Sequence, residues 1–162
     1  MQSTSSPSGP ALFDAGMFIA ALLKGDPRHA EALALVEAAR HGAVEACTTP
    51  GILSEVYGAL TWERALPRHR PEEASIAVRL LVEDPSAIRV LNEGLDVALR
   101  ALELATAYRL TARRIHDARH AAAALMAGLC SVYTYDIEDW KAFEAAGLQI
   151  AGPRSTLTRL QR

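Results

Sequence analysis

Short apolar runs alternate with amphipathic segments along most of this chain. The runs that predict buried strands cover residues 11–13, 43–48, 87–91, 131–135 and about 148–150. Between them, apolar residues recur every three or four positions, which is the period of a helix that buries one face. The pattern therefore predicts strands connected by helices, and chains of this kind fold around a mainly parallel sheet.

Capping residues mark where two of the helices begin. Asp26 before Pro27, and Thr49 before Pro50, are the residue types typical of an N-cap and a first helical position. Glycines, prolines and apolar periodicity set the other limits. The expected helices run from Asp14 to Gly25, from Pro27 to about Arg40, from Pro50 past Leu60, and over about 72–83, 95–108, 116–127 and 138–145.

The predicted fold is one three-layer α/β domain with a mainly parallel, roughly five-stranded sheet flanked by helices. A chain of 162 residues, half of them hydrophobic, suits a single core. We expect the domain over 11–151, a flexible Ser-, Pro- and Gly-rich tail over 1–10, and a C-terminal tail over 152–162. The longest stretch without Asp, Glu, Lys or Arg, residues 120–135, is shorter than the ~18 residues of a membrane span, so we expect a cytoplasmic protein.

Several side chains are expected to serve packing alone. Cys47 and Cys130 lack the paired spacing of a zinc or redox motif, and we expect both in the core. The helix over 95–108 is expected to be amphipathic, with an apolar face formed by Leu95, Leu99, Leu102 and Ala105. The aromatic residues expected to pack in the interior, and not to stack on bases, are Tyr57, Trp62, Tyr108 and Trp140.

The charge balance argues against a broad basic surface. Lys and Arg total 17 against 19 Asp and Glu, for a formal net charge of −2. RNA would therefore be bound by local patches. Two such patches are Arg113, Arg114, Arg119 and His120, and Arg64, Arg68, His69 and Arg70; ordinary solvated surface charge is the simpler interpretation of both.

Four acidic residues stand where a predicted strand ends or a predicted helix begins. Asp14 and Asp136 each follow a strand, while Glu55 and Asp117 lie in the first turns of helices. In parallel sheets, ligands bind beyond the carboxyl ends of the strands, so we expect these acids to meet there. Gathered carboxylates repel one another unless a cation holds them. The pattern indicates a divalent-metal site, and a hard metal held by carboxylates suits chemistry on phosphate.

Each of the four acids also has a plain structural explanation. Asp14 and Asp136 could be N-caps, and Asp117 could be a favourable charge in a first helical turn. Glu55 could be a solvated surface residue, but apolar residues of the inward stripe flank it. A carboxylate on that side of a helix needs a partner.

The sequence resembles the PIN-domain ribonucleases of the VapC toxin type from Leu12 to about Ile150. The matching segments are Leu-Phe-Asp-Ala-Gly at 12–16, Ser-Glu-Val at 54–56, His-Asp-Ala-Arg-His at 116–120 with the alanine run after it, and Thr-Tyr-Asp at 134–136. The resemblance implies a Mg²⁺-dependent endoribonuclease, with Mn²⁺ able to substitute. It implies the catalytic residues Asp14, Glu55, Asp117 and Asp136, and the metal ligands Asp14, Asp117, Asp136 and Asp139.

The same resemblance implies partners. The protein would be the toxin of a type II toxin-antitoxin pair, a homodimer, and the target of a VapB-type antitoxin. The apolar surface of the helices between Pro27 and Leu66 is the expected antitoxin groove.

Two positions depart from the family pattern. The family usually has Asn, Ser or Thr two residues after the first Asp, where this chain has Gly16. After Asp136 the usual Asp-x-Asp spacing is replaced, so either Glu138 or Asp139 is the auxiliary acid; we favour Asp139.

Three other kinds of function can be compared with the nuclease on the same residues. Gly16 motivates an RNA-binding or protein-interaction module whose metal site is degenerate. A phosphatase of the haloacid-dehalogenase kind needs a second Asp where Gly16 stands. Dinucleotide- and nucleoside-triphosphate-binding folds are disfavoured because no Gly-rich phosphate loop follows any strand. His116 and His120 are four residues apart and could share a zinc ion, but no third ligand has suitable spacing.

Overall fold

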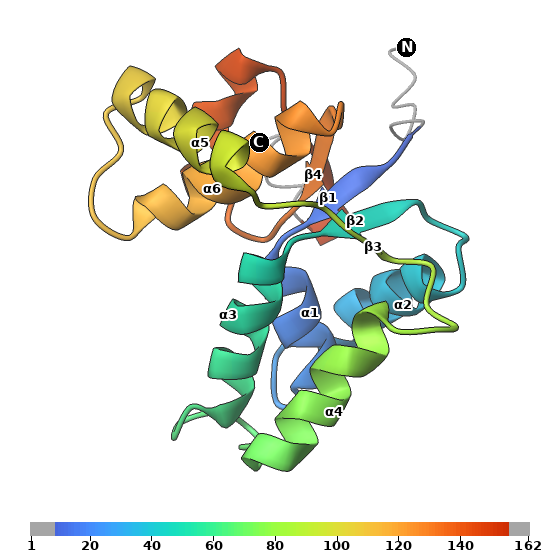
Figure 1. Ribbon diagram of the computed structural model, residues 1–162. Coiled ribbons are helices and arrows are strands. Elements are labelled where there is room, and N and C mark those ends of the chain that lie inside the picture. The colour runs from blue at the N-terminus through green and yellow to red at the C-terminus, as the bar shows by residue number, and fades with distance from the viewer. Residues whose placement is uncertain (1–8, 156–162) are drawn as a thin grey trace.

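The computed structural model describes residues 9–155, so the expectations for residues 1–8 and 156–162 lie outside the described residues. Five parallel strands form one sheet in the order β3-β2-β1-β4-β5 (Figure 1). Leu12 of β1 lies beside Cys47 of β2 and Val132 of β4. The strands are β1 (Ala11–Phe13), β2 (Ala46–Thr48), β3 (Arg89–Val90), β4 (Ser131–Tyr133) and β5 (Gln149–Gly152).

Helices cover both faces of the sheet, which makes three layers (Figure 1). On one face lie α1 (Ala15–Leu22), α2 (His29–Arg40), α3 (Pro50–Thr61) and α4 (Pro71–Val82). On the other lie α5 (Leu95–Ala107), α6 (Arg114–Met126), α7 (Ile137–Trp140) and the 3₁₀ helix η1 (Lys141–Ala146). This arrangement confirms the predicted three-layer α/β fold with a five-stranded parallel sheet.

Several predicted boundaries are wrong by a few residues. The second helix begins at His29, not at Pro27, because the Asp26 side chain accepts hydrogen bonds from Arg28 and does not cap a helix. Strands β2 and β3 are shorter than the apolar runs that predicted them. The predicted helix over 138–145 is divided between α7 and η1. Strand β5 continues to Gly152, one residue beyond the predicted domain end.

The inward face of α5 was predicted wrongly. Val97, Ala101 and Leu104 are buried, whereas Leu95, Leu99 and Leu102 of the predicted face are exposed and Ala105 is partly buried. Two apolar stripes run side by side on this helix, and periodicity alone does not say which one is buried against α6. The exposed stripe is Leu95, Leu99 and Leu102.

Three further packing expectations are also wrong. Cys130 is exposed, while Cys47 is buried as expected. Tyr57 and Trp62, on and directly after α3, are exposed as well.

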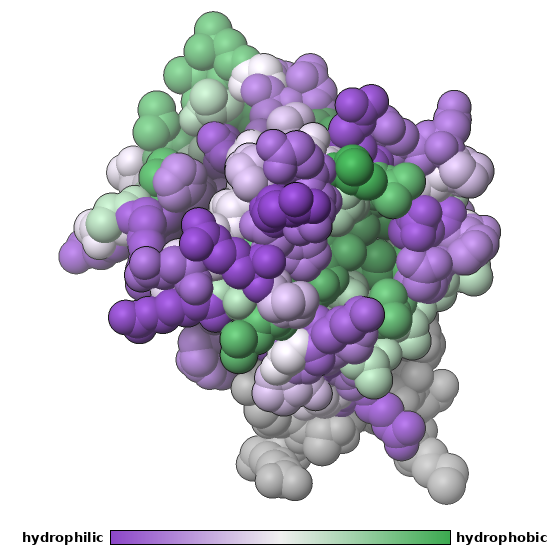
Figure 2. All heavy atoms as spheres, turned by 90° about the horizontal axis from the view of Figure 1, so that it is seen from below, coloured by the Kyte–Doolittle hydropathy of each residue, from purple (hydrophilic) through white to green (hydrophobic). Residues whose placement is uncertain are grey.

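In Figure 2, hydrophobic residues gather in a strip across the middle of the face shown, with hydrophilic residues on either side. Within residues 9–155, no helix is long and apolar enough to cross a membrane.

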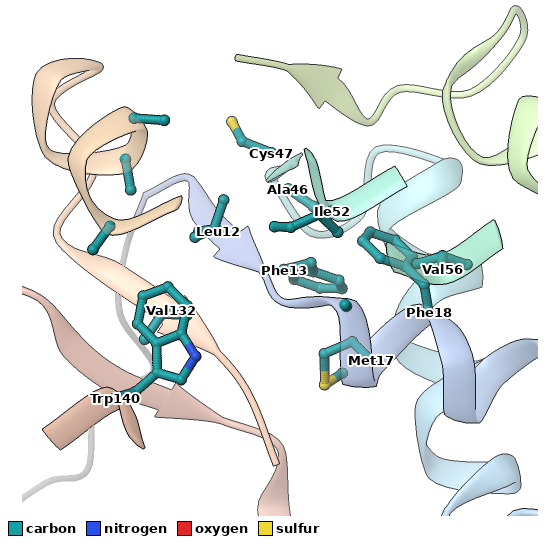
Figure 3. Close-up of a cluster of buried hydrophobic side chains, with 14 of the residues drawn as sticks. Leu12, Phe13, Met17, Phe18, Ala46, Cys47, Ile52, Val56, Val132 and Trp140 are labelled. Atoms are coloured by element: carbon teal, nitrogen blue, oxygen red, sulfur yellow. The ribbon is translucent and has the colours of Figure 1, made fainter. Parts of the chain in front are cut away.

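The core lies between β1, β4 and the helices around them. Phe13 of β1 stacks on Tyr133 of β4, with ring centroids 5.0 Å apart. Trp140 lies beside Val132 on one side of β1, while Ile52 lies on the other (Figure 3). The alanine block 121–124 of α6 is buried, as expected of a helix that lies close to a sheet.

Candidate acidic active site

The chain changes direction across the sheet next to β1. It proceeds from β1 to β2 and β3, then crosses back to β4 on the opposite side of β1. A parallel sheet opens a crevice at the carboxyl ends of its strands where such a reversal occurs. Here a cleft of about 410 Å³ is lined by Asp14 after β1, Asp136 after β4, Glu55 of α3 and Asp117 of α6. The structure thus brings all four predicted acids to one cleft.

Asp14 is the most buried of the four, at 9% exposure. Its Oδ1 accepts a hydrogen bond from Ala15 N at 2.8 Å, so Asp14 is also the N-cap of α1. Its Oδ2 accepts from Thr134 Oγ1 at 2.9 Å and from Trp140 Nε1 at 3.0 Å. Burial raises the pKa of Asp14, and these hydrogen bonds oppose the rise. Asp14 therefore caps α1 and lines the cleft at the same time.

The other two aspartates are crowded by like charges. Burial, and then the charges of Asp14 and Asp139, raise the pKa of Asp117 to about 6. Burial and a hydrogen bond with Asp139 raise the pKa of Asp136. Both raised pKa values mean that it costs free energy to ionise these carboxyl groups in the folded protein. A cation bound among these groups would relieve the repulsion.

We expect Asp117→Asn to stabilise the fold near neutral pH. A carboxyl whose folded pKa is raised stabilises the fold below its unfolded pKa, here 3.8, and loses that contribution as the pH rises through the folded value of about 6. Discounted for solvent screening, the loss is roughly 1–2 kcal/mol, or about 2–8 °C in melting temperature. Thermal unfolding at pH 7.5 should show this gain, and at pH 4 it should vanish. A variant that melts at or below the wild-type temperature at pH 7.5 would contradict the expectation.

Glu55 has the partner that its place on α3 required. Its Oε1 accepts a hydrogen bond from Nε2 of His120 at 2.7 Å, although 41% of the Glu55 side chain stays exposed. His120 itself is completely buried, so it is neither a surface cation for RNA nor an open zinc ligand. Burial alone would lower the pKa of His120, but its hydrogen bonds to Glu55 and Glu93 raise it to about 9. At neutral pH His120 therefore carries a proton on both ring nitrogens.

Glu93 is a partner of His120 that the sequence did not reveal. It stands in the loop before α5, outside the motifs that carried the resemblance. Its side chain is only 10% exposed and lies within 3.5 Å of Arg119 Nε. Burial alone would raise the pKa of Glu93, but the hydrogen bond from His120 and the charge of Arg119 lower it.

The two candidates for the auxiliary acid stand in different surroundings. Asp139 lines another cleft, which lies beside the cleft of the four acids, and its carboxylate is 3.6 Å from Arg114 Nε. Asp139 also contributes to the raised pKa values of Asp117 and Asp136. Glu138 is 83% exposed and pairs with Lys141 at 3.2 Å. Of these two acids, Asp139 is the one that lines a cleft.

A second cleft, of about 520 Å³, adjoins the first and shares Glu55, Asp117 and Asp136 with it. Basic side chains line this cleft: Arg113, Arg114, His116 and Arg119. One of the two predicted basic patches, without its buried His120, thus lies beside the acids.

Arg28 brings positive charge to the first cleft, and the sequence did not single it out. Its guanidinium is held by Asp26 at 2.9 Å and lies 4.4 Å from the ring centroid of Tyr135. Positive groups therefore stand on both sides of the acidic centre. Such an arrangement suits an extended polyanion that crosses the acids.

The acids fit a hard divalent cation in donor type. Oxygen ligands are those that Mg²⁺ and Mn²⁺ prefer, and Mg²⁺ usually binds one or two carboxylates while it keeps several waters. Among residues 9–155, no three His, Cys, Asp or Glu side chains stand close enough together to hold an ion by themselves. An ion in this cleft would thus rely on water for part of its coordination.

The fold and the acidic edge define a known class of protein. A family model of the PIN domain matches residues 11–145, so the chain belongs to the PIN domain family. Among solved structures, VapC20 of Mycobacterium tuberculosis, a toxin described as cleaving the sarcin-ricin loop, is similar in fold. The TM-score is 0.66 at 22% identity, over 90% of this chain and 100% of that one. A comparison with curated proteins gave no significant match.

Proposed function

We propose that this protein is a Mg²⁺-dependent endoribonuclease and the toxin of a type II toxin-antitoxin pair. The observation that carries the proposal is the meeting of Asp14, Glu55, Asp117 and Asp136 at one cleft at the carboxyl edge of the sheet. Membership of the PIN domain family and the likeness in fold to a VapC toxin support it.

In the proposed reaction, the acids hold the cation and the arginines hold the RNA. Bound Mg²⁺ or Mn²⁺ would supply neutralising charge at the phosphate and a bound water of lowered pKa. The residues proposed to hold it are Asp14, Asp117, Asp136 and Asp139.

Glu55 would act beside the metal ligands. Its carboxylate stands at the wall of both clefts, where it can accept the proton of the water that attacks the phosphodiester. Arg113, Arg114 and Arg119 would bind phosphates on one side of the scissile bond, and Arg28 would bind one on the other side. Alignment of the strand across both clefts would place one phosphodiester at the acids.

Chelation should abolish cleavage. Without a cation, the gathered carboxylates repel the phosphodiester as well as one another. We expect the purified protein to cleave RNA in Mg²⁺ or Mn²⁺, to lose cleavage in excess EDTA, and to regain it when Mn²⁺ is restored. A gel-based assay on total RNA measures this, and cleavage that persists in excess EDTA would contradict the proposal.

The second candidate is an inert RNA-binding module, and Gly16 is the feature that motivates it. A side chain at this position would meet no atom within 4 Å, so the polar contact expected in this family is absent although there is room for it. Wild-type protein that binds RNA but leaves it intact in Mn²⁺ would favour this candidate.

Two protein partners belong to the proposal. Exposed apolar side chains between Pro27 and Leu66 suit a VapB-type antitoxin, and the exposed leucine stripe of α5 suits a homodimer contact. The exposed apolar residues in the first region are Leu33, Tyr57, Trp62 and Leu66. We propose the cytoplasm as the place of action, where the RNA substrate is found.

A further inference from the structure

His120 stands at the centre of a buried polar cluster. Its Nε2 donates to Glu55 at 2.7 Å, and its Nδ1 faces Thr49 Oγ1 at 3.0 Å and Glu93 Oε1 at 3.3 Å. The imidazole is completely buried. Both ring nitrogens are therefore engaged, and the ring has little freedom to turn.

The cluster joins three segments that are distant in the sequence. Thr49 caps α3 by accepting from Ile52 N, Glu93 precedes α5, and His120 lies in α6. Its members hold the start of α3, and therefore Glu55 in the second turn of that helix, against α6. The cluster thus fixes the place of Glu55 relative to Asp117, which lies on α6 with His120.

Gly51 shows how tightly the cluster is packed. Its backbone N donates to Glu93 Oε2 at 3.1 Å. A Cβ at this position would overlap the guanidinium of Arg119 and lie 2.8 Å from Cε1 of His120. Glu93, Arg119 and His120 therefore all lie directly against the backbone of α3 at Gly51. This packing restricts movement of His120 away from Glu55.

We propose that His120, oriented by Thr49 and Glu93, is a positioning residue that fixes the carboxylate of Glu55 at the cleft. The inference rests on the proposed nuclease function for its effect on turnover. The side chain of Glu55 is 41% exposed, so without His120 its carboxylate would be free to turn into solvent. Groups that orient a side chain in a metal site typically contribute about 10- to 100-fold to activity or metal affinity.

The kinetic test compares three variants in Mn²⁺. His120→Leu, which fills a similar volume without a donor, should lower kcat about 10- to 100-fold with KM nearly unchanged. His120→Gln, whose amide can still donate to Glu55, should restore part of the loss. His41→Gln is the matched control, because His41 is the C-cap of α2 and 76% of its side chain is exposed. A folded His120→Leu protein with wild-type kcat would overturn the proposal.

A second measurement does not depend on cleavage. In ¹⁵N-labelled wild-type protein, we expect two imidazole N–H signals of His120 that exchange slowly with water, and Glu55→Gln should shift the Nε2–H signal. Rapid exchange of both protons, or no shift in Glu55→Gln, would overturn the proposal. If these signals behave as expected while the wild type leaves RNA intact, the arrangement around Glu55 stands and the nuclease function fails.

Discussion

Asp14→Asn is expected to lower RNA cleavage by roughly 10²- to 10⁴-fold, the range of effects that a group acting directly on the reaction contributes. Asp14 is the buried acid of the cleft, and its Oδ2 is held by Thr134 and Trp140. Asparagine keeps the shape and one oxygen acceptor, but it removes the charge that a cation would need.

The fold should survive this change. Burial raises the pKa of Asp14, which means that burying its charged carboxylate costs free energy. A neutral amide avoids this cost of burying a charge. The hydroxyl of Thr134 can rotate to accept from the new NH₂ group, but the single amide oxygen can accept from only one of Ala15 N and Trp140 Nε1, so one of these donors loses its acceptor. We expect the free energy of unfolding to fall by about 1–3 kcal/mol, the cost of one buried donor without an acceptor, as measured by denaturant unfolding.

Glu138→Gln is the matched control for Asp14→Asn. It also neutralises an acid near Asp136, but Glu138 is 83% exposed and pairs with Lys141. Cleavage should stay close to wild type. Equal activity in wild type, Asp14→Asn and Glu138→Gln would show that the acidic cleft does not carry out the reaction.

Trp140→Ala is expected to destabilise the protein by about 3–5 kcal/mol, or roughly 6–20 °C in melting temperature. Trp140 is 1% exposed, and its ring packs edge-on against Phe143 with centroids 5.5 Å apart. Truncation would leave a large cavity between α7 and the sheet. It would also remove the hydrogen bond from Nε1 to Asp14. Thermal unfolding followed by circular dichroism measures the loss.

Trp140→Phe separates packing from hydrogen bonding. Phenylalanine retains most of the aromatic volume but has no donor for Asp14. We expect a loss of about 1–2 kcal/mol, with a further rise in the pKa of Asp14 because one hydrogen bond to its carboxylate is gone. If both variants melt like the wild type, the indole does not support the site in the way that we describe.

Local signals account for much of what could be predicted. The apolar runs and helical periods gave the order of strands and helices, since each depends on residues close together in the chain. Thr49 was predicted as an N-cap and accepts from Ile52 N at 3.1 Å. Asp26 had the same signature, but its side chain holds Arg28 instead, because an Asp before Pro fits more than one local turn.

The faces of helices were harder to predict than their positions. On α5 the exposed leucines form as regular a stripe as the buried Val97, Ala101 and Leu104. Which stripe becomes buried depends on where the neighbouring helix α6 packs. That information lies in no single segment of the sequence.

The alternation of strands and helices, and the acids at their junctions, could be predicted from the sequence alone, because periodicity and capping are properties of neighbouring residues. The partners of those acids became known only from the folded structure. Thr49 and His120 are 71 residues apart, and Trp140 is 126 residues from Asp14. Contacts over such distances exist only after the sheet has formed and its helices have packed, so the hydrogen bonds of Asp14 and the burial of His120 beside Glu55 are results of packing.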